Sequence, residues 1–276
     1  MRAILVAELF KLAKQGKTWY ALGAVFLIEI IILASAYFQG ASILELLLDN
    51  LRQSFYFEGN LLNGNLLLYI VLNSLWFNVP LILMIVTSAM VTEEYKNGTL
   101  QTTLLQAVTK WELIVAKYLA AGIFTVLVIA LMMCTTFAMA YSIFGNGDLV
   151  VYLNTLNFFP ADVAFARICL AFGSGTLSML FYTTVSVTLG IILKEPAKTW
   201  IASAFFLIFC SLLLKADLGL GSYDALFFPK LTNTWQHFFY YDLDFEGIVL
   251  NNLFLLGYTL LFGGLGVYLF HKKDIG

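Results

Sequence analysis

The sequence predicts an all-α, polytopic membrane protein with six transmembrane helices. Hydrophobic residues make up 61% of the 276 residues and charged residues only 12%, whereas a soluble domain needs about 25% charged residues to wet its surface. The mean hydropathy of +0.88 and the long apolar runs between short charged stretches indicate spans through lipid. The net charge of −2 and the absence of a dense basic patch argue against a nucleic-acid partner.

The first 15 residues have an amphipathic pattern, in which Ile4, Leu9 and Phe10 alternate with charged residues such as Glu8 and Lys11. This pattern is typical of a helix that lies in the membrane interface. A cleaved signal peptide is the competing interpretation, but Glu8 interrupts its basic region and the apolar run that follows is too long. We therefore expect an interfacial helix over residues 1–15.

Six apolar runs follow, and each is expected to form a transmembrane helix. All but the fifth offer about 20 residues or more, which at 1.5 Å per residue match a hydrocarbon core of roughly 30 Å. None has the alternating polarity of a barrel strand. The expected spans are residues 19–38, 66–91, 118–143, 168–193, 199–214 and 247–270.

Basic residues predict the orientation of these spans. Eleven fall on the side that would hold both termini and four on the other, which also collects most of the acidic residues. The positive-inside rule then places both termini in the cytoplasm. We expect the protein in the plasma membrane of a prokaryote. Without a soluble loop or an internal repeat, one transmembrane domain over residues 1–276 is the simplest organisation.

The stretch of residues 92–110, between the second and third spans, has an unusual design. Gly98 permits a sharp turn, and Thr99 is a suitable N-cap for a short helix. Leu100 and Leu104 share one face of that helix at i, i+4 spacing. Thr109 and Glu112 form a Thr-x-x-Glu capping box that begins a further helix.

Two interpretations of this short helix remain open from the residues alone. It could dock into a groove on a cytoplasmic partner, or it could merely fix the tilt of its neighbours in the interface. If it docks, Leu100→Asp or Leu104→Asp should uncouple the partner while the protein still inserts.

The residues that could carry chemistry are sparse. There is no His-Glu-x-x-His zinc motif or complete phosphate-binding loop, and each of the three cysteines sits in an apolar run, where packing is its expected role. Gly173, Ser174 and Gly175 are expected to mediate helix packing. Glu29 lies deep within the first span, where it could line a conduit or be a hydrogen-bonded structural residue.

The residues 93–100, followed by Trp111, Glu112, Leu113 and Lys117, resemble the signature of type-2 ABC transporter permeases. The acidic pair, the Gly-Thr-Leu triplet, the aromatic-Glu-Leu opening of the next helix and the closing run of residues 270–275 are all similar to that family. The resemblance extends over essentially the whole chain and implies a permease subunit without a nucleotide site of its own.

This resemblance implies partners and roles. A second permease subunit, identical or not, would pair with the chain in the lipid bilayer, and a separate ABC ATP-binding subunit would bind ATP and Mg²⁺. The chain itself would bind no cofactor or metal and would not be an enzyme. Its coupling helix would present the partner-binding residues Glu93, Glu94, Gly98, Thr99, Leu100, Leu104 and Gln106.

The family also implies that the long extracellular loop over residues 215–246 dips back into the outer leaflet as short helices, with a break at Pro229. Its many aromatic residues suit an interfacial belt whatever the function. The leading hypothesis is an ATP-driven exporter. The alternatives are a non-transporting membrane anchor or assembly factor and, with less support, an intramembrane enzyme.

Overall fold

The computed structural model describes residues 1–52, 61–106, 108–153, 155–215 and 226–272. For residues 41–52 and 215 it describes the backbone only. It confirms a helical bundle with six helices long and apolar enough to cross a membrane. These spans lie in α2 (Gly16–Arg52), α3 (Gly64–Asn97), α5 (Lys110–Phe144), α6 (Ala161–Leu193), α7 (Pro196–Lys215) and α9 (Phe245–Lys272). Each includes the corresponding predicted run and extends beyond it.

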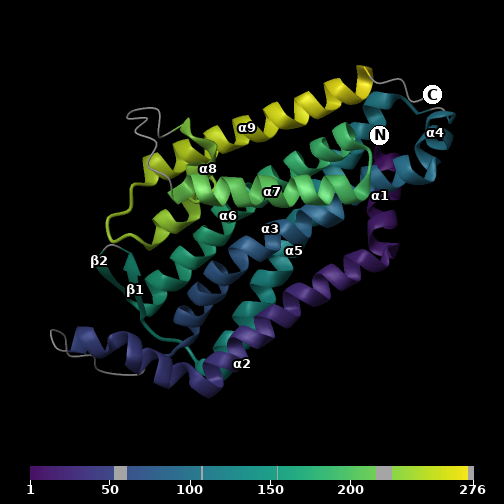
Figure 1. Ribbon diagram of the computed structural model, residues 1–276. Helices are drawn as coiled ribbons and strands as arrows, with labels where there is room; N and C mark the ends of the chain where they lie inside the picture. Colours follow the sequence, from purple (N-terminus) through teal and green to yellow (C-terminus); the bar gives the residue numbers. More distant parts are fainter. Residues whose placement is uncertain (53–60, 107, 154, 216–225, 273–276) are drawn as a thin grey trace.

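Two short helices lie at one end of this bundle. They are α1 (Arg2–Lys14), which precedes the first span, and α4 (Thr99–Leu104), which follows α3. Figure 1 places both at the end of the bundle where α9 ends, so the first residues of the chain and the end of its last helix share this end. We call it the α4 end.

The opposite end carries a feature that the all-α prediction lacks. Strands β1 (Leu149–Leu153) and β2 (Thr155–Phe159) form an antiparallel hairpin between α5 and α6. Val151 pairs with Asn157 in its register, and both are buried. The strands were missed because five-residue strands in a connecting loop give too short a pattern to separate from an apolar helix end. We call this the hairpin end.

Side-chain amides join α3 to the hairpin end. Asn63 caps α3 by accepting from the backbone N–H of Leu66 at 3.1 Å, and its amide donates to the carbonyl of Asp148 at 2.7 Å. The Asn65 amide donates to the carbonyl of Gly147 at 2.7 Å and accepts from the Tyr141 hydroxyl at 2.6 Å. The first turn of α3 is therefore fixed to the last turn of α5 and to the loop after it.

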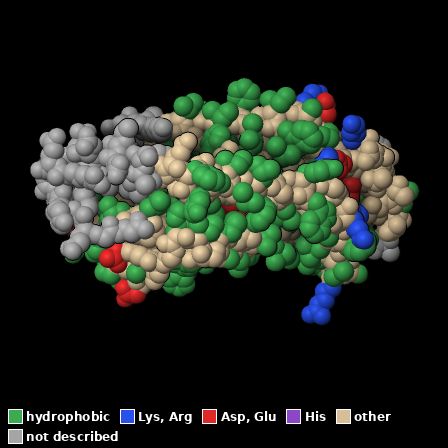
Figure 2. Space-filling model, turned by 90° about the horizontal axis from the view of Figure 1, so that it is seen from below, with side chains coloured by type: hydrophobic (Ala, Val, Ile, Leu, Met, Phe, Trp, Pro, Cys, Tyr) green, Lys and Arg blue, Asp and Glu red, His purple; other side chains and the backbone are tan. Residues whose placement is uncertain are grey.

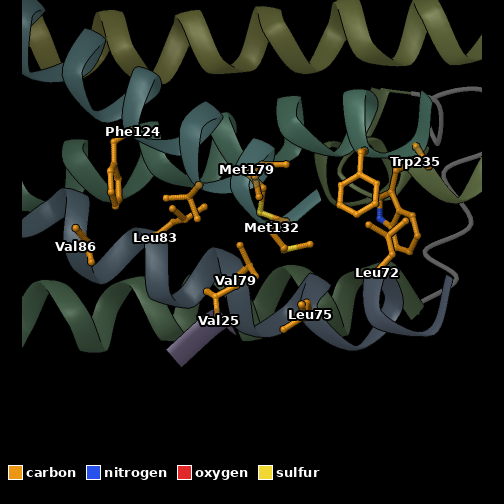
Figure 3. Packing of buried hydrophobic residues seen from close by; sticks show 14 of the residues in the cluster. Val25, Leu72, Leu75, Val79, Leu83, Val86, Phe124, Met132, Met179 and Trp235 are labelled. Carbon is orange, nitrogen blue, oxygen red and sulfur yellow. The ribbon is translucent and has the colours of Figure 1, made fainter. Parts of the chain in front are cut away.

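The core lies where α3 and α6 cross the middle of the bundle. Their buried side chains pack against those of α5 and, at the hairpin end, against a short 3₁₀ segment (Thr234–Phe239, η2). Figure 3 shows Val79 and Leu83 of α3 among Met132 of α5, Met179 of α6 and Val25 of α2. In contrast, α2, α7 and α9 keep much apolar surface exposed, as helices that face lipid do.

The loop after α7 contains short helices, as the family resemblance implies. The one-turn helix α8 (Phe228–Leu231) and η2 pack on the bundle through Leu231, Trp235, Phe238 and Phe239, which are buried. Pro229 does not break a helix, because it occupies the first turn of α8, where proline is tolerated. Residues 216–225 of this loop, and with them Tyr223 and Asp224, lie outside the described residues.

The surface reflects the same division into ends and middle. In Figure 2 apolar side chains cover the middle of the visible face, and lysine and arginine gather at the end where Figure 1 places α4. Among the described helix ends, this end holds Arg2, Lys11, Lys14, Lys17, Lys96, Lys110, Lys117, Lys194, Lys198 and Lys272. The hairpin end holds Arg167 and Lys230 with Asp148, Asp162, Asp242, Asp244 and Glu246. Lys273 to Ile275, which complete the family-like closing run, lie outside the described residues.

Candidate functional site: the elbow at the α4 end

A single residue joins α3 to α4. Gly98 has a φ of +68°, in the left-handed region that favours glycine, and it is both the C-cap of α3 and the residue before α4. The predicted turn is therefore confirmed. Thr99, however, is not an N-cap: it is the first residue of α4, and Gly98, which has no side chain, takes the cap position. We call residues 98–106, which are Gly98, α4 and the two residues after it, the elbow.

The apolar face of α4 is directed at its own chain. Leu100 is 1% exposed and belongs to the main core cluster, and Leu104 is half-buried against that cluster. Both residues therefore anchor α4 to the bundle, which makes them poor candidates for contact with a partner. The exposed apolar residue is the next one, Leu105, at 87%.

The remaining predicted site residues on α4 and directly beside it face outward. Gly98, Thr99 and Gln106 are exposed, and so are Gln101 and Thr102. The exposed face of the elbow is thus uncharged and polar, with Leu105 projecting from it. Ala107 lies outside the described residues.

The exit from the elbow is the predicted capping box. The Thr109 hydroxyl accepts from the backbone N–H of Glu112 at 3.2 Å, and the Glu112 carboxylate accepts from the backbone N–H of Thr109 at 3.4 Å. These contacts fix the start of α5 at Lys110 and so set where the elbow ends. The N-terminal ammonium of α1 lies 3.8 Å from the Glu112 carboxylate.

Behind the elbow, two carboxylates and two ammonium groups form a closed ring. The Glu8 carboxylate contacts the Nζ atoms of Lys11 at 2.7 Å and Lys117 at 2.8 Å. The Glu94 carboxylate contacts the same two Nζ atoms, each at 2.8 Å. Because each carboxylate uses a different oxygen for each lysine, the ring joins α1, α3 and α5. We call it the charge ring.

Three members of the charge ring are largely removed from solvent, whereas the side chain of Lys11 is 45% exposed. The Lys117 side chain is 0% exposed and that of Glu8 is 3% exposed, and Lys117 also donates to the carbonyl of Met90 at 3.0 Å. Buried charges are tolerated only when they are paired and hydrogen-bonded. Burial lowers the pKa of Lys11, but its hydrogen bonds to Glu8 and Glu94 and their charges raise that pKa by more, so it lies above its ordinary value of 10.5.

Consecutive residues at the end of α3 reach different neighbours. Glu93 forms an ion pair with Lys17 at the start of α2, and Glu94 belongs to the charge ring. The next residue, Tyr95, places its ring 5.3 Å from the Nζ of Lys194 in the turn between α6 and α7. Since successive helical residues point about 100° apart, the last turns of α3 contact most of the surrounding helices.

The acidic pair Glu93 and Glu94 was predicted from the sequence, but its lysine partners were not. Glu8 and Lys11 were expected to face water on an amphipathic helix. Lys11 is exposed, but Glu8 is only 2% exposed, whereas Val6, on the opposite side of α1, is 65% exposed. One signal could have revealed the ring. Lys117 interrupts an apolar run, and a charge in such a run needs a buried partner.

The structure places Glu29 far from the elbow, between α2 and α5. The carboxyl group is 0% exposed, and its Oε2 accepts a hydrogen bond of 2.7 Å from the Thr135 hydroxyl. Its Oε1 has no hydrogen-bond partner among the described residues. Because a charged side chain near the middle of a membrane helix costs roughly 2.5–3.5 kcal/mol on insertion scales, this arrangement needs an explanation beyond packing.

No cluster of metal-ligating side chains occurs in the part of the chain that the structure describes. In a comparison with protein-family models, residues 21–276 match the family described as protein of unknown function (DUF2705). No curated protein sequence matches the chain.

Proposed function

The chain belongs to the DUF2705 family, whose description assigns no function, and we propose from its own residues that it is the membrane subunit of an ATP-driven transporter, an exporter in the cell's plasma membrane. A separate ATP-binding subunit would dock on the elbow and bind ATP and Mg²⁺. The observation that carries the proposal is the elbow itself. One face of α4 is anchored to the bundle, and the opposite face is exposed and uncharged.

The elbow has the construction that a docking site needs. Leu100 and Leu104 hold α4 from within, so Leu105 and the polar residues beside it stay available for a partner. Binding interfaces need a central aromatic or aliphatic anchor that enters a pocket of the partner, with a polar rim around it. Leu105 is an exposed aliphatic residue with polar neighbours, so it replaces Leu100 as the expected contact residue.

The charge ring supports transmission of force from the elbow. A load on α4 passes through Gly98 into α3, and the ring joins the end of α3 to α1 and α5. The ion pair of Glu93 with Lys17 and the contact of Tyr95 with Lys194 extend the connection to α2 and to the turn between α6 and α7. Movement of a docked partner would therefore reach several spans at once.

The distribution of charge supports the orientation. The basic residues at the α4 end would lie in the cytoplasm by the positive-inside rule, and the acidic hairpin end outside. Both termini and the elbow would then face the compartment that contains ATP. A second permease subunit, the same chain or a relative, would complete the transporter beside the apolar faces that α2, α7 and α9 expose.

We expect an ATPase gene beside the gene of this chain. Docking is tested by co-expression of the tagged chain with that ATPase, and by the affinity of the purified subunits in nanodiscs. Leu105→Asp should weaken binding about tenfold or more, since loss of a hot spot costs roughly 2 kcal/mol. Tyr152→Asp is the matched control, because Tyr152 is an apolar residue 69% exposed at the hairpin end.

Equal affinity of the wild-type chain and Leu105→Asp would contradict docking at the elbow. Leu100→Asp is unsuitable for this test, because a carboxylate at that buried position would detach α4 from the bundle and lower stability. A chain that binds its ATPase but moves no substrate when ATP is supplied would favour the anchor or assembly role.

A further inference from the structure

A lateral groove follows the seam between α2 and α5 for most of its length. Three cavities lie along it in order from the α4 end, with volumes of about 370, 270 and 370 Å³. The first two share Trp19, Leu22, Val128 and Leu131, and the third begins one residue beyond Glu29, at Ile30. We call this the α2–α5 groove.

The groove opens toward the hydrocarbon of the membrane. Its rim carries apolar side chains with large exposed fractions, such as Phe26 at 45%, Leu127 at 60% and Leu131 at 51%. Both helices belong to the six apolar spans. A molecule that enters the groove therefore comes from the lipid phase.

Glu29 lies near the middle of the groove and is the one ionisable carboxyl group among the described residues that line the three cavities. It is the fourteenth residue of the 25-residue span Gly16–Gly40, which places it about 20 Å along that span at 1.5 Å per residue. Thr135 satisfies Oε2, whereas Oε1 has no hydrogen-bond partner among the described residues. A carboxyl group in this position attracts a hydrogen-bond donor, and best a cationic one.

We propose that the α2–α5 groove is a binding site for a lipid-soluble, linear amphiphile that carries an ammonium group, with the ammonium at Glu29 and the apolar chain along the groove. The side chains on both sides of Glu29 are apolar, from Leu22 and Val128 to Leu33 and Met139. Binding sites of this kind combine a mostly apolar lining with a few placed polar groups.

The shape of the groove selects an alkyl chain over a protein segment. One turn of a helix with its side chains, about 10–12 Å across and 5.4 Å long, occupies roughly 400–600 Å³, which is more than any one of these cavities of about 270 to 370 Å³. A single alkyl chain is much narrower than a helix, so we expect it to be the better occupant. The alternative occupant is the tail of a bulk lipid whose head group Glu29 does not bind. The experiment below distinguishes this tail from the ammonium-bearing ligand.

This binding site is inferred from the groove and Glu29 alone. If the chain is the transport subunit proposed above, the ligand would be its class of substrate. The test uses the purified chain in phosphatidylcholine nanodiscs with no ATPase, so its failure leaves the docking proposal untouched. Three photoreactive probes share one diazirine-bearing alkyl chain and end in an ammonium, a hydroxyl or a carboxylate group. Mass spectrometry maps the residues that each probe labels.

We expect the ammonium probe to label α2 and α5 around Leu22, Val128 and Leu131 more strongly than the other two probes do. Glu29→Gln, which keeps the shape and removes the charge, should lower the ammonium labelling about tenfold, or 1.4 kcal/mol. It should leave labelling by the hydroxyl probe unchanged. Equal labelling by all three probes, unaffected by Glu29→Gln, would show that only bulk lipid occupies the groove.

A second variant keeps the proposal testable if Glu29→Gln does not fold. Leu131→Trp fills the groove from its exposed rim and retains Glu29, and it should abolish ammonium labelling of α2 and α5. Leu261→Trp is the matched control, because Leu261 is 62% exposed on α9, away from the groove. Labelling that persists in Leu131→Trp, or that is as strong on α9 as on α2 and α5, would overturn the proposal.

Discussion

Lys117 is an ammonium group with no exposed surface, and the residues around it explain how the chain tolerates it. Its Nζ contacts one oxygen of Glu8, one of Glu94 and the carbonyl of Met90. Replacing such a group with an apolar one leaves its partners buried and only partly compensated. The charge ring therefore makes the α4 end sensitive to the loss of any one member.

We expect Lys117→Met to lower the free energy of unfolding by about 3–5 kcal/mol, because the two carboxylates then share Lys11 alone. Lys198→Met is the matched control. Its side chain is 67% exposed in an i, i+3 pair with Glu195, so its loss should cost less than about 1 kcal/mol. Denaturant unfolding in detergent measures both, and similar costs for the two variants would show that the ring does not stabilise the bundle.

His237 gives the hairpin end a predictable pH dependence. It lies half-buried in η2, where burial lowers its pKa below the ordinary 6.5 and the charge of Asp244 offsets only part of that effect. The unfolded chain therefore takes up a proton at a pH where the folded chain resists it. The stability due to neutral His237 is complete above pH 6.5 and is lost as the pH falls below it.

We expect the melting temperature of the wild-type chain to fall more between pH 7.5 and pH 5 than that of His237→Gln. The remaining titratable groups are the same in both chains, so the difference isolates His237. Identical pH profiles would contradict the assignment.

The pair α3 and α6 is packed around glycine. A Cβ atom at Gly175 would overlap the indole of Trp76, whereas one at Gly173 would meet nothing within 4 Å. Trp76 cannot retreat freely, because its ring lies 4.9 Å from that of Trp235. This confirms the expected packing role for Gly175 and not for Gly173.

We expect Gly175→Ala to destabilise the bundle by about 1–3 kcal/mol through overpacking, and Gly173→Ala to change its stability by less than about 0.5 kcal/mol. Thermal unfolding of the two variants in the same detergent makes the comparison. An equal effect of both substitutions would mean that the α3–α6 contact is not set by Gly175.

The elements were largely predictable because apolar length is a strong local signal in the sequence. All six spans, the turn at Gly98 and the capping box at Thr109 follow from residues close together in the chain. The charge ring could not be predicted, because Glu8 and Lys117 meet across 109 positions. For the same reason, the local pattern of residues could not reveal that Leu100 packs inward while Leu105 faces out.

The molecule as a whole has a basic end and an acidic end separated by an apolar belt. If the positive-inside rule holds, the elbow faces the cytoplasm and the hairpin faces outward. Gln106 and Tyr152 are exposed at these two ends, so cysteines placed there report the orientation.

We expect a membrane-impermeant maleimide to label Tyr152→Cys in intact cells and to label Gln106→Cys only after lysis. The wild-type chain, with Cys134, Cys169 and Cys210, gives the background. Labelling of Gln106→Cys in intact cells would show that the orientation is the opposite one. The elbow would then lie outside the cell, where no cytoplasmic ATPase could bind it.

The two ends of α3 are tied to α5 by different means. Asn65 holds Tyr141 and the loop after α5 at the hairpin end, and Glu94 holds Lys117 through the charge ring at the α4 end. Because α3 is attached to α5 near both of its ends, these contacts oppose sliding of α3 along α5 and separation of the two helices. If a docked partner displaces Gly98 as proposed, α3 and α5 would therefore move together, and the start of α2 would follow through the ion pair of Lys17 with Glu93.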